Sequence, residues 1–194
     1  MTKIKICGVT QLSEVEMMNQ LQPDLVGFVF AKGRHQVDAQ KAKELRNQLD
    51  PNIKAVGVFV DTPIQTIKQL YQAQIIQVAQ LHGGQSESAV TELMDSGIPV
   101  IKVFKPAKQP VTATAADYVM VDSGNGSGKP LDWQSLQFNF KQPLMVAGGL
   151  TPTNAIEAIN NLHPDYLDVS SGVETNGTKD AQLVESIITT AHKN

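Results

Sequence analysis

The sequence contains one cysteine, Cys7, and four histidines among 194 residues. One cysteine excludes an intrachain disulfide. Neither Cys7 nor any histidine has a second ligand at metal-binding spacing on the same predicted element, so we expect no metal site.

Long apolar runs and a strong net charge are also lacking. The longest apolar run, residues 25–31, is far shorter than the about 20 residues that span a bilayer. A net charge of −3 gives no general attraction for nucleic acid or anionic membranes. We expect no signal peptide ahead of the first predicted strand. We therefore expect a soluble, cytoplasmic protein that acts on a small molecule, not on nucleic acid or a membrane.

Short apolar runs separated by amphipathic segments make up most of the chain. Eight of them are typical of buried strands: residues 4–7, 25–30, 55–60, 76–81, 99–104, 118–122, 143–147 and 166–169. Continuous apolar strands suit a parallel sheet covered by helices. With about seven or eight helices between them, they predict an α/β fold, a parallel (β/α)8 TIM barrel forming a single compact domain over residues 1–194.

Helix starts are marked by capping residues. The expected first turns lie at Thr10, Asp38, Thr62-Pro63, Ser86 and Thr151-Pro152. Residues 105–116 are the weakest helix prediction because Pro106 and Pro110 interrupt them. An open doubly wound sheet is the alternative, but no G-x-G-x-x-G follows the first strand.

The candidate site residues follow the predicted strands, because the carboxyl ends of barrel strands share one mouth. They are Cys7, Arg34 in the basic loop 32–35, His82, Asp122, Gly148, Gly149, Ser170, Ser171 and Gly172. A lone cysteine is more often a buried hydrophobe. His82 could equally be a structural histidine, and Asp168 could either orient the last loop or cap it.

Glycines after the seventh and eighth strands predict a phosphate site, because backbone N–H groups can approach an anion closely there. The loop 123–129 is not a P-loop: three residues separate Gly124 from Gly128, and Pro130 replaces the magnesium-binding Ser or Thr. A mobile lid fits this loop better. Thiol, carboxylate, phosphate site and a cation from Arg34 or Lys32 favour proton transfer on an anionic phosphosugar. Non-catalytic binding stays open.

Several motifs resemble those of the phosphoribosylanthranilate isomerase family, a TIM-barrel family of tryptophan biosynthesis. They are residues 5–10 (KICGVT), 27–30 (GFVF), 57–60 (GVFV), 80–83 (QLHG), 126–129 with 132–133, 148–150 (GGL) and 168–174 (DVSSGVE). The resemblance implies an Amadori rearrangement of N-(5-phosphoribosyl)anthranilate by a monomer or homodimer that needs no cofactor. A related aminoaldose isomerase of histidine biosynthesis has an aspartate where Cys7 stands and a substrate with two phosphates.

The resemblance also implies roles for individual residues. Cys7 would be the general base and Asp122 the general acid, which calls for a lowered Cys7 pKa and a raised Asp122 pKa. An arginine after the second strand would bind the anthranilate carboxylate. The loop here is about one residue short, so both Arg34 and His35 fit that position. We favour Arg34, because a guanidinium pairs with a carboxylate through two parallel bonds.

Overall fold

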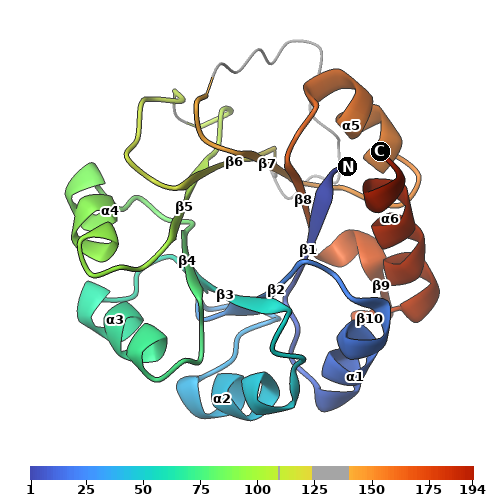
Figure 1. Ribbon diagram of the computed structural model, residues 1–194, viewed down its shortest axis with the longest axis horizontal. Coiled ribbons are helices and arrows are strands. Elements are labelled where there is room, and N and C mark those ends of the chain that lie inside the picture. Colours follow the sequence, from blue (N-terminus) through green and yellow to red (C-terminus); the bar gives the residue numbers. More distant parts are fainter. Residues whose placement is uncertain (109, 124–139) are drawn as a thin grey trace.

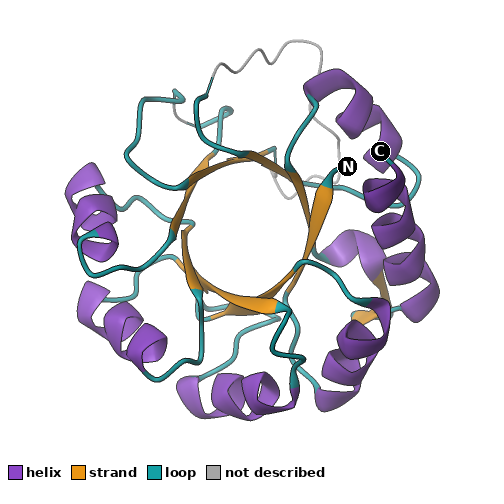
Figure 2. Cartoon of the chain, in the orientation of Figure 1, coloured by secondary structure: helices purple, strands orange, loops and turns teal. Residues whose placement is uncertain are grey.

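The protein is a closed eight-stranded barrel surrounded by helices, seen down its axis in Figure 1 and coloured by element type in Figure 2. A computed structural model describes residues 1–108, 110–123 and 140–194. The strands run in chain order, all parallel, and β1 pairs with both β2 and β8. They are β1 (Lys3–Cys7), β2 (Leu25–Val29), β3 (Lys54–Phe59), β4 (Val78–Leu81), β5 (Val100–Phe104), β6 (Tyr118–Asp122), β7 (Leu144–Ala147) and β8 (Tyr166–Val169). The predicted TIM barrel is confirmed.

The helices are α1 (Leu12–Leu21), α2 (Ala39–Gln48), α3 (Ile64–Gln72), α4 (Glu87–Met94), α5 (Ala155–Leu162) and α6 (Ala181–Lys193). Two of the predicted caps are confirmed: Asp38 accepts a hydrogen bond from the Lys41 N–H, and Ser86 from the Ala89 N–H. Helix α3 begins at Ile64, directly after the Thr62-Pro63 pair that was predicted to open it. The described residues between β5 and β6, 105–108 and 110–117, form no α-helix.

Two predicted helix starts are wrong. The cap of α1 is Gln11 rather than Thr10, because the Glu14 carboxylate accepts hydrogen bonds from the N–H groups of both Thr10 and Gln11 (2.7 and 3.1 Å). Helix α5 begins at Ala155 rather than after Thr151. The Asn154 side chain accepts from the Thr151 N–H at 2.8 Å, which holds a turn ahead of the helix.

Inside the barrel, the amino-terminal end is filled by apolar side chains. One buried cluster contains Leu25, Val56, Val78, Ile101, Val103, Met120, Met145 and Ala147. Tyr118 and Tyr166 pack against this cluster, and their two rings meet edge to face with centroids 5.9 Å apart. This packing leaves a cavity of only about 20 Å³ among these side chains.

After β8 the chain forms a 3₁₀ turn, Ser171–Val173, and a small hairpin of β9 (Glu174–Thr175) and β10 (Thr178–Lys179). The hairpin leads into α6, beside the mouth of the barrel. Among the described helices, none combines the length and apolar character that a membrane span requires.

Candidate active site

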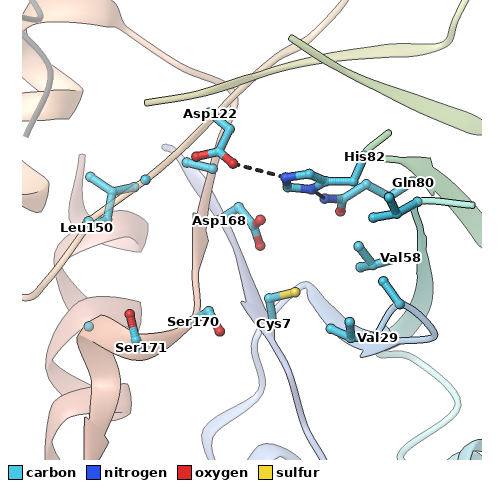
Figure 3. Close-up of a pocket in the computed structure, with 16 residues that line it drawn as sticks. Cys7, Val29, Val58, Gln80, His82, Asp122, Leu150, Asp168, Ser170 and Ser171 are labelled. Atoms are coloured by element: carbon cyan, nitrogen blue, oxygen red, sulfur yellow. Dashed lines mark hydrogen bonds and ion pairs between the residues drawn. The ribbon is translucent and has the colours of Figure 1, made fainter. Parts of the chain in front are cut away.

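A pocket of about 490 Å³ opens at the carboxyl ends of the strands (Figure 3). Its lining comprises Cys7, Val29, Ala31, Val58, Val60, Gln80, His82, Asp122, Ala147, Gly148, Gly149, Leu150, Asp168, Ser170, Ser171 and Gly172. Every residue that the sequence assigned to the site, except Arg34, therefore lies on this one cavity.

Cys7 ends β1, and its sulfur faces the pocket in Figure 3. The residue is only 7% exposed. Burial raises the pKa of the Cys7 thiol, and although the Lys5 ammonium lowers it, the net shift is upward. The expected lowering of this pKa toward neutrality is therefore wrong for the protein without a ligand, because desolvation of the thiolate outweighs the nearby positive charge.

Asp122, at the end of β6, belongs to a hydrogen-bonded chain that starts at β4. The Gln80 amide nitrogen lies 2.9 Å from His82 Nδ1, and His82 Nε2 lies 3.0 Å from Asp122 Oδ2. With the amide donating to Nδ1, the imidazole carries its proton on Nε2 and donates it to Asp122 Oδ2. His82 therefore orients the Asp122 carboxyl group, as the dashed line in Figure 3 shows.

The loops after β7 and β8 have backbone shapes that need glycine. Gly148 and Gly149 have φ of 103° and 65°, which side-chain-bearing residues rarely adopt. A Cβ on Gly172 would lie only 1.7 Å from the Leu150 carbonyl oxygen. The two loops are thus in close contact, and Gly148, Gly149, Ser170, Ser171 and Gly172 all line the pocket. This arrangement suits an anion such as phosphate.

Arg34 and His35, the two candidates for the carboxylate contact, both pair with Glu174. Arg34 Nη2 lies 2.7 Å from Glu174 Oε2, and His35 Nε2 lies 2.9 Å from Oε1. Lys179 Nζ also lies 2.6 Å from Oε1. The Arg34 side chain is 56% exposed and does not line the pocket. Its role as carboxylate ligand stays a prediction.

Several lining residues were not assigned to the site from the sequence. Gln80 precedes His82 by two residues on one strand, so the period of two could have placed both on the barrel interior. Its Oε1 is buried and has no hydrogen-bond partner among the described residues. Val29, Ala31, Val58 and Val60 form an apolar wall opposite the glycine loops, which suits an aromatic ring. The predicted lid, residues 123–129, lies outside the described residues from 124 onward.

Within residues 1–108, 110–123 and 140–194, no group of three or more His, Cys, Asp or Glu side chains is arranged to hold a metal ion. The groups available for chemistry in the described part of the pocket are therefore a thiol, two carboxyls, an imidazole, an amide and two serine hydroxyls.

Comparison with known proteins gives one consistent result. Residues 4–190 match the family model described as N-(5'-phosphoribosyl)anthranilate (PRA) isomerase. The N-(5'-phosphoribosyl)anthranilate isomerase of Lacticaseibacillus casei BL23 is 45% identical over 189 residues, covering 97% of this chain and 94% of the relative. That of Streptococcus mutans UA159 is 36% identical over 197 residues, covering 100% of both.

Solved structures agree. The crystal structure of TrpF from Jonesia denitrificans has a TM-score of 0.88 and 29% identity, covering 99% of this chain and 97% of that one. A phosphoribosyl anthranilate isomerase in complex with reduced 1-(o-carboxyphenylamino)-1-deoxyribulose 5-phosphate has a TM-score of 0.83 and 27% identity over 100% of both chains. This chain belongs to the N-(5'-phosphoribosyl)anthranilate isomerase family.

Proposed function

We propose that this chain isomerises N-(5'-phosphoribosyl)anthranilate to 1-(2-carboxyphenylamino)-1-deoxyribulose 5-phosphate, a step of tryptophan biosynthesis. The observation that carries the proposal is the pairing of Cys7 and Asp122 on one cavity that ends in the two glycine loops. An aldose–ketose rearrangement needs one group that gives a proton and one that takes a proton on opposite parts of a sugar.

In the proposed mechanism, a protonated Asp122 gives its proton to the furanose ring oxygen. The C1–O bond breaks, and the anthranilate nitrogen supplies the electron pair that forms the Schiff base. The Cys7 thiolate then removes the proton from C2, which gives an enolamine. Tautomerisation of the enolamine yields the ketone at C2. The substrate's own nitrogen accepts the electrons, so the steps use only the acid and the base.

The rest of the pocket would hold the substrate in position. The phosphate would bind the backbone N–H groups around Gly148, Gly149 and Gly172, next to Ser170 and Ser171. The anthranilate ring would pack on the apolar wall of residues 29, 31, 58 and 60. His82 would keep the Asp122 carboxyl turned toward the sugar.

For the anthranilate carboxylate we propose Arg34. Glu174 holds the guanidinium through Oε2, while Lys179 and His35 pair with the other oxygen. If Arg34 left, Glu174 would keep its ion pair with Lys179, so the exposed arginine can turn toward a bound carboxylate without stranding a buried charge. Burial lowers the pKa of His35, so this imidazole is the weaker anion ligand.

The test is turnover by Cys7→Ala and Asp122→Asn, followed through the anthranilate fluorescence of substrate made in situ. We expect each variant to lose at least about a hundredfold in kcat, the usual contribution of a general acid or base. Substrate should still bind. Asp95→Asn, an exposed aspartate after α4, is the matched control and should keep full activity. Near-normal turnover in Cys7→Ala and Asp122→Asn would refute the mechanism, and an inactive parent protein would favour a binding role.

For assembly and location we propose a monomer or homodimer in the cytoplasm. One structural neighbour, from Thermotoga maritima, is described as a dimeric phosphoribosylanthranilate isomerase from which monomers were generated. Light scattering coupled to size-exclusion chromatography would distinguish the two assembly states, and a larger oligomer would contradict both.

A further inference from the structure

Lys5 lies inside the barrel, which is an unusual position for a lysine. Its side chain has no exposed surface. Side chains of residues two apart on a strand point to the same face, so Lys5 and Cys7 both project into the barrel. Cys7 lines the pocket and Lys5 does not, so the ammonium group sits one step deeper, beneath the pocket floor.

Asp168 on β8 is the ionic partner of this buried ammonium. The two residues are paired in the register of β1 and β8, and Lys5 Nζ lies 2.7 Å from Asp168 Oδ1. Unlike Lys5, Asp168 faces the pocket, where Figure 3 shows it near Cys7. The carboxylate therefore keeps the ammonium charged at a position that water does not reach.

Gly27 on β2 leaves the space in which the sulfur and the ammonium meet. A Cβ at this position would lie 2.7 Å from Cys7 Sγ and 3.2 Å from Lys5 Nζ. The Cys7 sulfur and the Lys5 ammonium nitrogen therefore both lie in the space that a side chain at Gly27 would fill. Gly27 is paired with Cys7 in the register of β1 and β2. The Lys5 ammonium therefore lies near the Cys7 sulfur while it pairs with Asp168.

We propose that Lys5 is a positioning residue for the isomerase reaction: its buried ammonium, held by Asp168, is the counter-ion that stabilises the Cys7 thiolate. The proposal rests on the proposed function, in which Cys7 is the base. A thiolate is strongly disfavoured in a desolvated site unless a cation lies beside it. Proton removal from C2 requires that thiolate, so Lys5 would set how much of the enzyme is ready to react.

The other charged or titratable groups around Cys7 are few among the described residues. They are Asp168 on β8 and Lys179 on β10, with Asp122 and His82 across the pocket. Lys5 and Lys179 favour the thiolate, whereas Asp168 and burial oppose it. Lys5 is the stronger of the two cations at the sulfur. Removal of Lys5 should therefore disfavour the Cys7 thiolate.

The test is the pH dependence of alkylation by iodoacetamide, which reacts with thiolates. Because Cys7 is the only cysteine in the chain, the rate reports this residue alone. We expect Lys5→Met to shift the profile to higher pH by about one unit or more, so that alkylation below the midpoint is about tenfold slower.

Lys102→Met is the matched control. Lys102 is another buried lysine, but it lies on β5, across the barrel from β1, and donates to the Gln85 carbonyl. Its removal should leave the alkylation profile unchanged. Circular dichroism of each variant checks the fold. If Lys5→Met does not fold, Lys5→Gln takes its place: a shift to higher pH supports the proposal, and the parent profile overturns it.

A folded Lys5→Met protein with the parent profile would overturn the proposal. A purely structural ion pair would lower the stability of Lys5→Met without moving the thiol titration. Alkylation needs no turnover, so its result is separate from the Cys7→Ala experiment. Normal turnover in Cys7→Ala would refute the base role, whatever Lys5 does to the thiol.

Discussion

The two ends of the barrel interior are built from the same strands but hold opposite kinds of side chain. On β4, Val78 belongs to the apolar cluster at the amino end, and Gln80, two residues later, lines the pocket. On β6, Met120 belongs to the apolar cluster, and Asp122, two residues later, lines the pocket. One half therefore stabilises the barrel by burying apolar surface, and the other half positions polar groups around a cavity. Substitutions in the two halves should fail differently.

The largest effect on folding is expected at the amino end. Ile101→Ala removes a buried side chain from the apolar cluster and leaves a cavity, which should lower the free energy of unfolding by about 2–5 kcal/mol. Urea unfolding measures this change, and kcat of the folded protein should stay within about twofold of the parent. Ile156→Ala on α5, where the side chain is 39% exposed, is the control and should change stability by less than about 1 kcal/mol. A large loss of kcat in folded Ile101→Ala would break the division between the halves.

At the carboxyl end, His82→Gln should lower activity and leave stability nearly unchanged. It removes the imidazole N–H that orients Asp122, so kcat should fall by about tenfold or more while unfolding changes little. Steady-state kinetics on the folded variant check this expectation. Unchanged kcat with lowered stability would make His82 a structural histidine, the alternative that the sequence left open.

The pH dependence of kcat/KM sharpens the account of the thiol. The base must be deprotonated to act, and burial raises the Cys7 pKa above its ordinary value. From neutral pH upward, kcat/KM should therefore increase by up to about tenfold per pH unit while Asp122 stays protonated, and should stay level where the loss of the Asp122 proton offsets the ionisation of Cys7. A profile that falls from pH 7 to pH 9 would mean that Cys7 is already ionised or is not the base.

Arg34→Ala and His35→Ala separate the two candidates at the rim. We expect Arg34→Ala to raise KM more, by about tenfold, because a guanidinium stays charged whereas burial lowers the pKa of His35. Michaelis constants of the two variants provide the measurement. If His35→Ala raises KM more, the carboxylate contact belongs to His35.

At Glu174 the expected effect is on stability rather than on activity. Burial opposes its charge, but Lys179, His35 and Arg34 together lower the pKa of Glu174 below its ordinary value. A carboxyl group with a lowered pKa contributes stability above its unfolded-state pKa and loses that contribution as the pH falls through its folded-state pKa. Glu174→Gln should thus be less stable than the parent at pH 7, and the gap should shrink in acid. Thermal unfolding across pH 3–7 measures it; a gap that does not change with pH would contradict this role.

The barrel and most of the pocket could be predicted from the sequence, because both depend on where each apolar strand ends. Cys7, His82 and Asp122 directly end or follow such runs, and the closed topology brings them to one mouth. Lys5 was not predicted to be functional, because the alternation of lysine and isoleucine in β1 looks like a strand with one face in water. In a closed barrel both faces are covered, so the lysine is buried inside.

Two other predictions, the direction of the Cys7 pKa shift and the start of α5, were wrong because each depends on competing interactions. The Cys7 pKa depends on the competition between burial, Lys5 and Asp168, and the distances among them come from strand register rather than from spacing in the chain. The start of α5 depends on the Asn154 side chain, which accepts a hydrogen bond from the Thr151 N–H and so competes with the helix start predicted at Thr151. Both outcomes required tertiary geometry.

The measurement that most directly tests the central claim is a crystal structure of this protein with reduced 1-(o-carboxyphenylamino)-1-deoxyribulose 5-phosphate. We expect the phosphate on the loops of Gly148–Gly149 and Ser170–Gly172, the Cys7 sulfur beside C2 of the sugar, and the Asp122 carboxyl across the sugar from that sulfur. A ligand bound with C2 out of reach of the sulfur, or with its phosphate away from these loops, would contradict the proposed acid–base pair.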